Sequence, residues 1–345
     1  MFLHALATAV PASTFTQEQC WEFAQRPSLQ QRLKKRSMLI LRTILRGEHG
    51  IGTRHFAVDD PGTVFDMGPD ELNALFRTEA PRLAVQALTK ALGQAGVAPQ
   101  DLDALLICTC TGYLCPGITS YVSEQLGLRT DVFLQDLVGL GCGAAIPTLR
   151  AAQAVLAANP DATVACVAVE ICSAAFYLDD DPGVIISACL FSDGAAATIW
   201  RAIPKPERVL RAYDFRTVHL PVHRDKLRFE SRDGKLRNLL DRSVPELAAN
   251  AVSLLWQQRG TRPIARVVAH SGGRDVIEAL APVVAPYSLE STTRVLRNYG
   301  NMSSPSVLFA LDDALKNAPA DAEGDYWLVS FGAGFAAHSC RIATQ

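Results

Sequence analysis

LGCGAAIPTLRAAQAVLAANP (residues 140–160) and YGNMSSPSVLFALDDALKNAP (residues 299–319) are two stretches of one design. In each, a glycine and a residue with a reactive or polar side chain are followed by small residues and by a helical pattern that stops before a proline. The alignment places Cys142 opposite Asn301. This similarity indicates that the chain contains an internal duplication.

Further matching segments occur in the same order in both parts of the chain: ALLICTCTG (104–112) with ARVVAHSGG (265–273), and LFSDGAAATIW (190–200) with SFGAGFAAHSC (330–340). The second of these matches places Phe191 opposite Phe331. The repeated order predicts two copies of one α/β unit, an N-terminal half (1–205) and a C-terminal half (206–345). A chance match of small-residue helix starts is the simpler alternative.

The composition favours a compact α/β protein. Hydrophobic residues make up 49% of the 345 residues and charged residues 20%, and the net charge is −2, so a general role in nucleic-acid binding is not expected. Consecutive apolar positions are typical of strands buried on both faces, and they occur at 104–110, 162–169, 195–200, 265–270 and 325–331. Amphipathic helical patterns lie between them, for example at 81–96 and 146–158.

The chain is expected to be a reduced cytoplasmic protein. No apolar run approaches 18 residues, so we expect no membrane insertion, and the N-terminus resembles a strand ending at Pro11 more than a signal peptide. Nine cysteines in a chain of this length, most of them in apolar runs, suggest small buried side chains rather than a disulfide framework.

Cys142 differs from the other cysteines in its surroundings. It lies between two glycines just before a predicted helix, where the backbone turns sharply and a ligand can come close. The positive end of the helix dipole would favour a thiolate, which is a nucleophile at neutral pH. The alternative is a small core residue in a Gly/Ala turn.

A cysteine nucleophile needs an imidazole, and His270 ends a predicted strand before Ser-Gly-Gly. This is where α/β sheets place ligand-binding groups, although a buried core histidine would look the same. Asn301 fits either a site residue or an ordinary helix N-cap. If a pseudo-twofold axis relates the halves, Cys142 and Asn301 approach that axis from opposite sides.

The blocks GCGAAIPTLRAA, AHSGG and YGNMSSPSVLFALD resemble the three catalytic blocks of type III polyketide synthases, the chalcone synthase-like enzymes. LFSDGAAATIW and SFGAGF resemble the LFGDGAAA segment and the GFGPG loop of that family, and the resemblance runs nearly from end to end. It implies a thiolase fold, which is a duplicated five-layered αβαβα sandwich, and a homodimer.

The resemblance also implies the chemistry. Cys142 would attack an acyl-CoA starter and hold the growing chain, with His270 as its ion-pair partner. His270 and Asn301 would donate to the malonyl thioester oxygen as carbon dioxide leaves, and Phe191 would give the malonyl carboxylate an apolar wall. The implied activity is iterative condensation of malonyl-CoA, followed by cyclisation or release, without a metal or an organic cofactor.

The remaining site positions follow from the same alignment. The implied pocket residues are Cys110, Thr111, Cys115, Asn238, Phe331, Gly332, Ala333 and Gly334. Asn238 stands where chalcone synthase has a second gatekeeping phenylalanine, which implies a larger or more polar cavity. Ala333 replaces the proline of the plant enzymes, and the resulting Gly-Ala-Gly loop resembles that of ketoacyl synthase III. An enzyme of that type, making a single condensation, is therefore the closest alternative.

Residues 26–54 carry eight basic side chains and one acidic one, Glu48. Such a stripe in a nearly neutral protein suggests an anionic partner, so we expect Arg36, Arg42 and Arg46 to bind the phosphates of coenzyme A. The aligned family positions themselves are Leu41, Ile44 and Glu48. A solvated helix face is the alternative, and an acyl carrier protein could dock on the same patch.

Two other classes of protein fit poorly. A cysteine hydrolase using Cys142, Asp193 and His270 would need a glycine at position 140, where this chain has leucine. A dinucleotide-binding loop beginning at Gly139 has its third glycine misplaced. The starter group, the number of extensions and the cyclisation mode depend on cavity shape and do not follow from these motifs.

Overall fold

The structure is a computed structural model that describes residues 1–205, 209–317 and 324–344, and it contains one long mixed sheet. The strands of its first part are, in spatial order, β5 (Phe133–Leu137), β4 (Ala104–Cys108), β6 (Val164–Glu170), β7 (Gly194–Arg201) and β1 (Phe2–Ala9). The second part continues with β8 (Leu210–His219), β13 (Ala336–Thr344), β12 (Asp325–Gly332) and β11 (Ile264–Ala269). The two parts meet at a single pairing, Phe2 with Arg211.

The two parts repeat one topology. In the first, β4 and β6 are parallel, and β7 then pairs antiparallel with both β6 and β1. In the second, β11 and β12 are parallel, and β13 then pairs antiparallel with both β12 and β8. Among the described residues the second part has no counterpart of β5. The matching order agrees with a duplicated unit, while the proposed boundary between residues 205 and 206 adjoins residues outside the described part.

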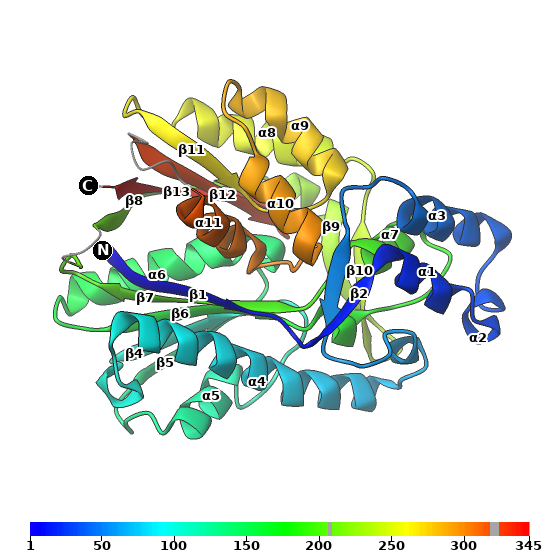
Figure 1. The fold of residues 1–345 in the computed structure, drawn as a ribbon, viewed down its shortest axis with the longest axis horizontal. Coiled ribbons are helices and arrows are strands. Elements are labelled where there is room, and N and C mark those ends of the chain that lie inside the picture. Colours follow the sequence, from blue (N-terminus) through cyan, green and yellow to red (C-terminus); the bar gives the residue numbers. More distant parts are fainter. Residues whose placement is uncertain (206–208, 318–323, 345) are drawn as a thin grey trace.

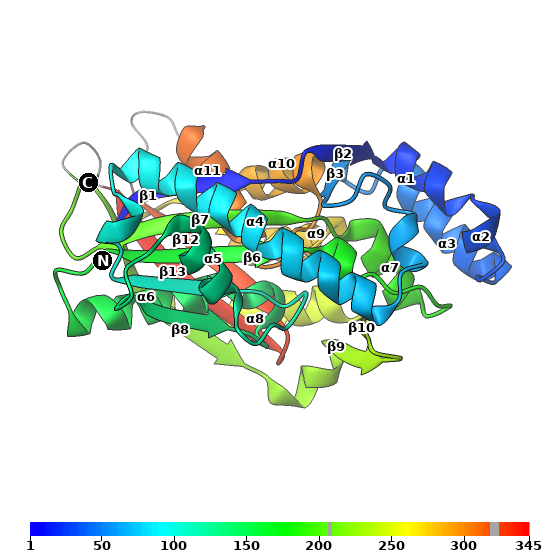
Figure 2. The ribbon, with the colours of Figure 1, turned by 90° about the horizontal axis from the view of Figure 1, so that it is seen from below.

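Helices cover both parts of the sheet and fill the space between them (Figures 1 and 2). The helices between the two parts are α6 (Ala145–Ala158) and α11 (Ser306–Lys316), with α10 (Glu290–Tyr299) beside α11. The first part is covered on its outer side by α4 (Pro69–Ala95) and α5 (Ile118–Leu126), and the second by α8 (Val244–Gln257) and α9 (Arg274–Val284). This arrangement confirms the five-layered sandwich.

The apolar core is divided as these layers require. A central cluster joins Leu149 of α6 and Leu308 of α11 to Trp200 and Leu328, which come from the two parts of the sheet. One further cluster lies between the first part and its outer helices, and another lies between the second part and its outer helices. Burial of side chains on both faces explains why the strands are apolar at consecutive positions.

A smaller structure, which we call the cap, lies at one end of the sandwich (Figures 1 and 2). It consists of β2 (Ser13–Thr16), α1 (Gln17–Ala24), α2 (Pro27–Gln30), α3 (Lys35–Arg46) and β3 (Thr53–Phe56). Helix α7 (Pro182–Leu190) contacts α3 and the hairpin of β9 (Leu227–Arg232) and β10 (Lys235–Leu240). A fourth apolar cluster joins the cap to Cys142, Phe176 and Phe191. The cap therefore packs against the candidate site rather than against the sheet.

Most predicted elements are confirmed, with one correction. The five predicted strands and the helix at 146–158 are present with small shifts at their ends. The helix predicted to start at Pro81 instead begins at Pro69 and passes through Pro81. The side chain of Glu71 accepts from the Gly68 N–H at 2.6 Å and caps this earlier start, and burial of Phe76 and Leu83 outweighs the missing N–H of Pro81. The last two residues of the segment 299–319 lie outside the described residues.

None of the described helices combines the length and hydropathy that crossing a membrane would require. All nine cysteines are free thiols, and seven of them are buried, as the sequence indicated. The exceptions are Cys110, which is half-buried, and Cys115, which is exposed.

Candidate active site

The candidate nucleophile lies in a tight turn at the entrance to α6. Cys142 occupies the short 3-10 helix Gly141–Gly143, and α6 starts two residues after this turn. The turn packs against the end of β12, where Ser330 Oγ donates to the Gly143 carbonyl at 3.0 Å. A Cβ at Gly332 would lie 2.5 Å from the Gly143 nitrogen, so only glycine permits this approach. Gly332 therefore supports the backbone around the thiol.

One cavity joins the residues that the sequence singled out. Cys142, His270, Asn301, Phe191 and Phe331 all line a space of about 260 Å³, which we call the reaction cavity. They come from distant segments: the turn before α6, the end of β11, the loop before α11, the end of α7 and β12. The structure thus brings together the predicted thiol, imidazole and carboxamide.

The carboxamide of Asn301 is held in a fixed orientation. Its Nδ2 donates to the Gly272 carbonyl at 3.1 Å, and its Oδ1 accepts from the Ser303 N–H at 2.8 Å. The backbone of Asn301 also forms a parallel bridge with Phe191. These contacts leave the remaining N–H of Nδ2 as the group that a substrate oxygen can use.

His270 is anchored through its backbone and one ring face. Its N–H donates to the Val329 carbonyl at 2.9 Å, and its ring meets Phe331 edge to face, with the centroids 5.2 Å apart. Its Nδ1 has no hydrogen-bond partner among the described residues. Buried polar atoms without a partner are uncommon in folded proteins.

Burial controls the ionisation of both groups. It raises the pKa of the Cys142 thiol to about 12, and the charge of Glu170 acts in the same direction. Burial also lowers the pKa of His270 to about 3. Burial therefore opposes the thiolate expected from the helix N-terminus, because loss of hydration favours a neutral thiol and a neutral imidazole.

The sequence analysis did not identify Ser303 as a site residue, although it lies in the YGNMSS block. Its hydroxyl donates to Cys142 Sγ at 3.2 Å and also lies 3.2 Å from Cys110 Sγ. The backbone of Ser303 adopts φ 60°, which is unusual for a residue other than glycine. Ser303 is therefore held in a costly backbone conformation that directs its hydroxyl to the two sulfurs.

The fully buried carboxyl group of Glu170 lies next to Cys110, and the sequence analysis did not identify this residue either. It ends β6, and a charged residue at the end of an all-apolar run was the signal that could have found it. It accepts hydrogen bonds from the side chain of Thr109, the N–H of Cys110, both the N–H and hydroxyl of Thr111, and the hydroxyl of Ser304. Burial raises its pKa, and these donors oppose that effect.

Phe191 follows the last residue of α7, and its position is fixed by a buried cation. Arg54 Nη1 donates to the carbonyls of Ala188 at 2.6 Å and Phe191 at 3.1 Å. The Asp193 carboxylate, two residues further on, accepts from the Ala57 N–H at 2.7 Å. The cap thus holds the chain on both sides of the phenylalanine.

Two more cavities lie near the thiol, and His270 is not among the described residues that line them. A narrow one of about 40 Å³, which we call the inner cavity, is lined by Cys142, Cys110, Thr111, Asn238 and Ala333 among others. It shares Cys110, Thr111 and Ala333 with an open cavity of about 520 Å³. Three predicted pocket residues line none of these three cavities as the described residues define them: Cys115, Gly332 and Gly334. Cys115 is exposed, Gly332 packs against the turn that holds Cys142, and the Gly334 carbonyl contacts His219.

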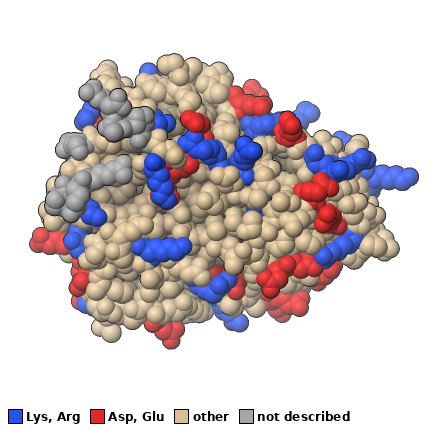
Figure 3. All heavy atoms as spheres, viewed as in Figure 1, with Lys and Arg blue, Asp and Glu red and all other residues tan. Residues whose placement is uncertain are grey.

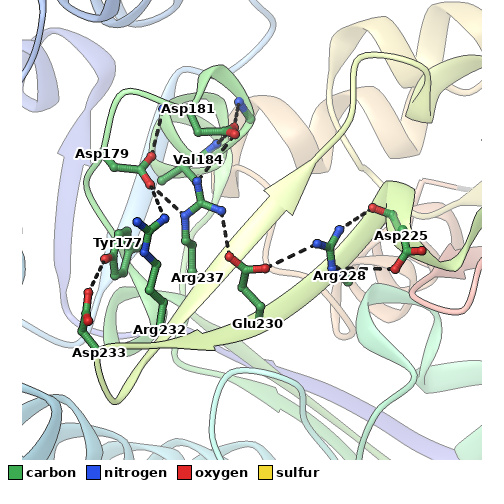
Figure 4. Close-up of polar contacts among 11 residues, drawn as sticks. Tyr177, Asp179, Asp181, Val184, Asp225, Arg228, Glu230, Arg232, Asp233 and Arg237 are labelled. Atoms are coloured by element: carbon green, nitrogen blue, oxygen red, sulfur yellow. Dashed lines mark hydrogen bonds and ion pairs between the residues drawn. The ribbon is translucent and has the colours of Figure 1, made fainter.

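A network of ion pairs holds the β9–β10 hairpin beside the inner cavity (Figure 4). Arg237 is buried between three carboxylates, with contacts of 2.7 Å to Asp179, 2.9 Å to Glu230 and 3.5 Å to Asp181. Asp181 also caps α7 by accepting from the Gly183 N–H at 2.8 Å. The network therefore links the hairpin, which carries Asn238, to the helix that carries Phe191.

The predicted CoA-binding residues do not reach the reaction cavity. Arg36, Arg42 and Arg46 are exposed on α3, at the end of the molecule where basic and acidic side chains mix (Figure 3), and Arg46 pairs with Glu18 at 3.3 Å. Arg242 and Arg274 line the cavity together with Ile44 and His49 of the predicted basic stretch, and Arg274 donates to the Glu48 carbonyl at 2.7 Å. Arg36, Arg42 and Arg46 do not line this cavity, and their binding of coenzyme A stays a prediction.

Comparisons with known proteins agree with this arrangement. The family model of FAE1/type III polyketide synthase-like proteins matches residues 10–218, and that of the C-terminal part of 3-oxoacyl-[acyl-carrier-protein] synthase III matches residues 257–343. The chain is 31% identical to 3,5-dihydroxyphenylacetyl-CoA synthase from Amycolatopsis orientalis over 73% of this chain and 71% of that protein. It is 26% identical to 1,3,6,8-tetrahydroxynaphthalene synthase from Streptomyces coelicolor, over 96% of this chain and 89% of that one.

Solved structures share the fold. The crystal structure of the Streptomyces coelicolor tetrahydroxynaphthalene synthase matches with a TM-score of 0.87 and 24% identity, over 100% of this chain and 99% of that one. PKS-I from the brown alga Ectocarpus siliculosus matches with a TM-score of 0.88 and 24% identity, over 99% and 98% of the two chains. The relatives favour polyketide synthesis over a single condensation, and the chain belongs to the type III polyketide synthases, acyl-transferring enzymes with a thiolase fold.

Proposed function

We propose that this polyketide synthase loads an acyl-CoA starter on Cys142 and extends it with malonyl-CoA, using His270 and Asn301 for the decarboxylation. The observation that supports this proposal most directly is that these three side chains and Phe191 line one cavity. No metal or organic cofactor is required by this chemistry, because the thioester itself acidifies the carbon next to its carbonyl.

Loading begins with transfer of the Cys142 proton to His270. The sulfur attacks the thioester carbonyl, the bond from that carbon to the sulfur of CoA breaks, and the imidazolium returns the proton to the departing CoA thiolate. Because burial favours neutral groups on both residues, the charged pair forms only when substrate is bound. The hydroxyl of Ser303 donates to the sulfur and stabilises its negative charge.

Decarboxylation uses the same imidazole as a hydrogen-bond donor together with Asn301. The bond between the malonyl carboxylate and the α-carbon breaks, its electron pair forms the enolate, and carbon dioxide leaves. Donors aimed at the enolate oxygen in a water-poor cavity contribute about 3 kcal/mol each by analogy with oxyanion holes. Phe191 and Phe331 provide an apolar surface that disfavours the carboxylate and accepts the neutral gas.

The phosphates of CoA bind, in this proposal, at Arg242 and Arg274. Both line the reaction cavity, and Arg242 is exposed without an ion pair among the described residues. Arg274 donates to the Glu48 carbonyl at 2.7 Å, which ties α9 to the end of the cap. Arg36, Arg42 and Arg46 do not line the cavity, although delivery by an acyl carrier protein across that surface is compatible with their position.

Assembly as a homodimer is part of the proposal. Three large apolar side chains are exposed on or next to β5, the edge strand of the sheet: Tyr113 (72%), Phe133 (51%) and Val138 (52%). Such a patch on a sheet edge is typical of an interface. The open cavity includes Tyr113 and Val138, so a second copy would close it on one side.

The test is a product analysis with malonyl-CoA and a panel of acyl-CoA starters, measured by liquid chromatography and mass spectrometry. We expect products that carry several malonyl-derived units, and loss of all products in Cys142→Ala. His270→Gln should slow both the loading of an acyl group and the release of carbon dioxide from malonyl-CoA, whereas Asn301→Asp should slow the release of carbon dioxide while an acyl group still loads. Products with one added unit only would favour the ketoacyl synthase III-type alternative.

A further inference from the structure

Ala333, in the middle of the loop 332–334, lines both the inner cavity and the open cavity. Cys110 and Thr111 also line both cavities. The inner cavity has a volume of about 40 Å³ and includes Cys142, whereas the open cavity has about 520 Å³. A polyketide that is bonded to Cys142 Sγ and outgrows the inner cavity therefore passes Ala333 as it enters the open cavity.

Both ends of this loop are fixed by contacts of the backbone. At one end, Gly332 packs so closely on the turn that holds the thiol that a Cβ there would lie 2.5 Å from the Gly143 nitrogen. At the other end, the side chain of Phe335 is fully buried, and its carbonyl accepts from the Leu220 N–H at 2.8 Å. Only the two residues between these ends depend on other contacts for their orientation.

The carbonyl of Gly334 is held by His219, the last residue of β8. His219 Nε2 lies 3.1 Å from this oxygen, and because a carbonyl only accepts, Nε2 carries the proton and donates it. Gly334 has φ 120°, and a Cβ there would lie 3.4 Å from the same nitrogen. Glycine therefore allows the backbone to present its carbonyl to the imidazole.

This hydrogen bond draws the loop away from the passage between the two cavities, because His219 lines neither of them as the described residues define them. Ala333 is held in close contact with the turn at the same time, since a Cβ on Gly141 would lie 3.0 Å from the Ala333 nitrogen. Without the donor, the Gly334 carbonyl can rotate, and the adjoining Ala333 can turn into the passage.

We propose that His219 is a positioning residue that sets the length of the polyketide. It holds Ala333 clear of the passage, so that a polyketide on Cys142 receives more malonyl-derived units before it leaves. This inference rests on the proposed function and adds control of product length to it. His219 touches no reacting atom and acts only through the loop.

The test is a product analysis with hexanoyl-CoA as starter and malonyl-CoA. Liquid chromatography and mass spectrometry measure the ratio of products with three or more malonyl-derived units to shorter products. His219→Leu removes the donor and should lower this ratio about two- to tenfold, which is the range over which one hydrogen bond shifts an equilibrium. His219→Gln keeps an N–H donor and should restore the wild-type ratio. Ala333→Val narrows the passage directly and should lower the ratio as well.

Two controls separate this effect from a general disturbance of the fold. His223→Leu makes the same exchange in the same segment, at a side chain that lines none of the three cavities as the described residues define them, and should keep the wild-type ratio. Loading of hexanoyl on Cys142, followed by intact-protein mass spectrometry, should be as fast in His219→Leu as in the wild type, because the turn keeps its hydrogen bond to Ser330. Circular dichroism and thermal unfolding identify a variant that does not fold, and His219→Phe, which also lacks the donor, then replaces His219→Leu.

The outcomes distinguish this role from the proposed function. If hexanoyl loads on Cys142 and is extended, but the ratio in His219→Leu equals that of the wild type or falls equally in His219→Gln, the role of His219 is wrong and the proposed function stands. The role is also wrong if His219→Leu slows loading as much as it reduces the longer products. If no acyl group appears on Cys142 of the wild type, both proposals are wrong. A lower ratio in His219→Leu, with normal loading and rescue by His219→Gln, supports the role of His219.

Discussion

Removing the hydroxyl of Ser303 should make Cys142 a slower nucleophile. This hydroxyl donates to the sulfur at 3.2 Å and lowers the pKa of the thiol, against the larger opposite effect of burial. A hydrogen bond to a charged acceptor is worth about 1.5–3 kcal/mol, which corresponds to at least about a tenfold loss of thiolate at fixed pH. Ser303→Ala should therefore react with iodoacetamide about ten times more slowly than the wild type at pH 8.

A second variant separates the hydroxyl from the backbone. Because Ser303 has φ 60°, alanine keeps the strain of about 1 kcal/mol that glycine relieves. Ser303→Gly and Ser303→Ala should differ in unfolding free energy yet show the same slow alkylation, measured by intact mass against time. Alkylation as fast as in the wild type in both variants would refute the role assigned to this hydroxyl. Slow alkylation in only one of them would assign the effect to the backbone.

Three further predictions follow from the charges around the site. Burial lowers the pKa of His270 to about 3 in the folded protein, whereas the unfolded chain binds this proton below about pH 6.5. Between these two pKa values only the unfolded chain is protonated, so the wild type loses stability as the pH falls. His270→Gln should therefore lose about 2 kcal/mol less than the wild type between pH 7 and pH 5 in urea unfolding, and parallel losses would contradict this pKa. Arg237→Met leaves three carboxylates without their buried partner and should cost about 3 kcal/mol in unfolding free energy, whereas Arg232→Met, whose side chain is 56% exposed, should cost little. Equal losses in these two variants would show that the network does not hold the hairpin. Arg242→Ala should raise the KM for malonyl-CoA more at low salt than at high salt, and an increase in Arg36→Ala instead would favour the assignment made from sequence.

The fold could be predicted because its signals are local and repeated. The paired stretches around Cys142 and Asn301 indicated a duplication, and apolar positions on both faces of the strands indicated buried sheets. The start of α4 could not be found in this way, because proline at position 81 is normally a helix boundary and only packing of the finished helix shows otherwise. The grouping of Cys142, His270 and Asn301 followed from the repeat together with the family resemblance.

The parts of the site that were missed depend on contacts between distant segments. Ser303 acts on the Cys142 thiol through a hydrogen bond and Glu170 through its charge, and no spacing in the sequence reveals either contact. The effect of burial on the pKa of Cys142 could not be predicted, because a helix N-terminus is visible in a sequence whereas the degree of burial is not. Arg242 and Arg274, which line the reaction cavity, were not identified for a similar reason: a cluster of charge along the chain does not show which side chains line a cavity.

The most direct test of the account is to find where the acyl chain is attached during turnover. The protein is quenched in the presence of a starter acyl-CoA and malonyl-CoA, digested, and mapped by peptide mass spectrometry. The account predicts starter and extended chains on the peptide that contains Cys142, with release of one carbon dioxide for each added unit, and none of these chains in Cys142→Ala. Extended chains attached to any other residue, or products formed by Cys142→Ala, would contradict it.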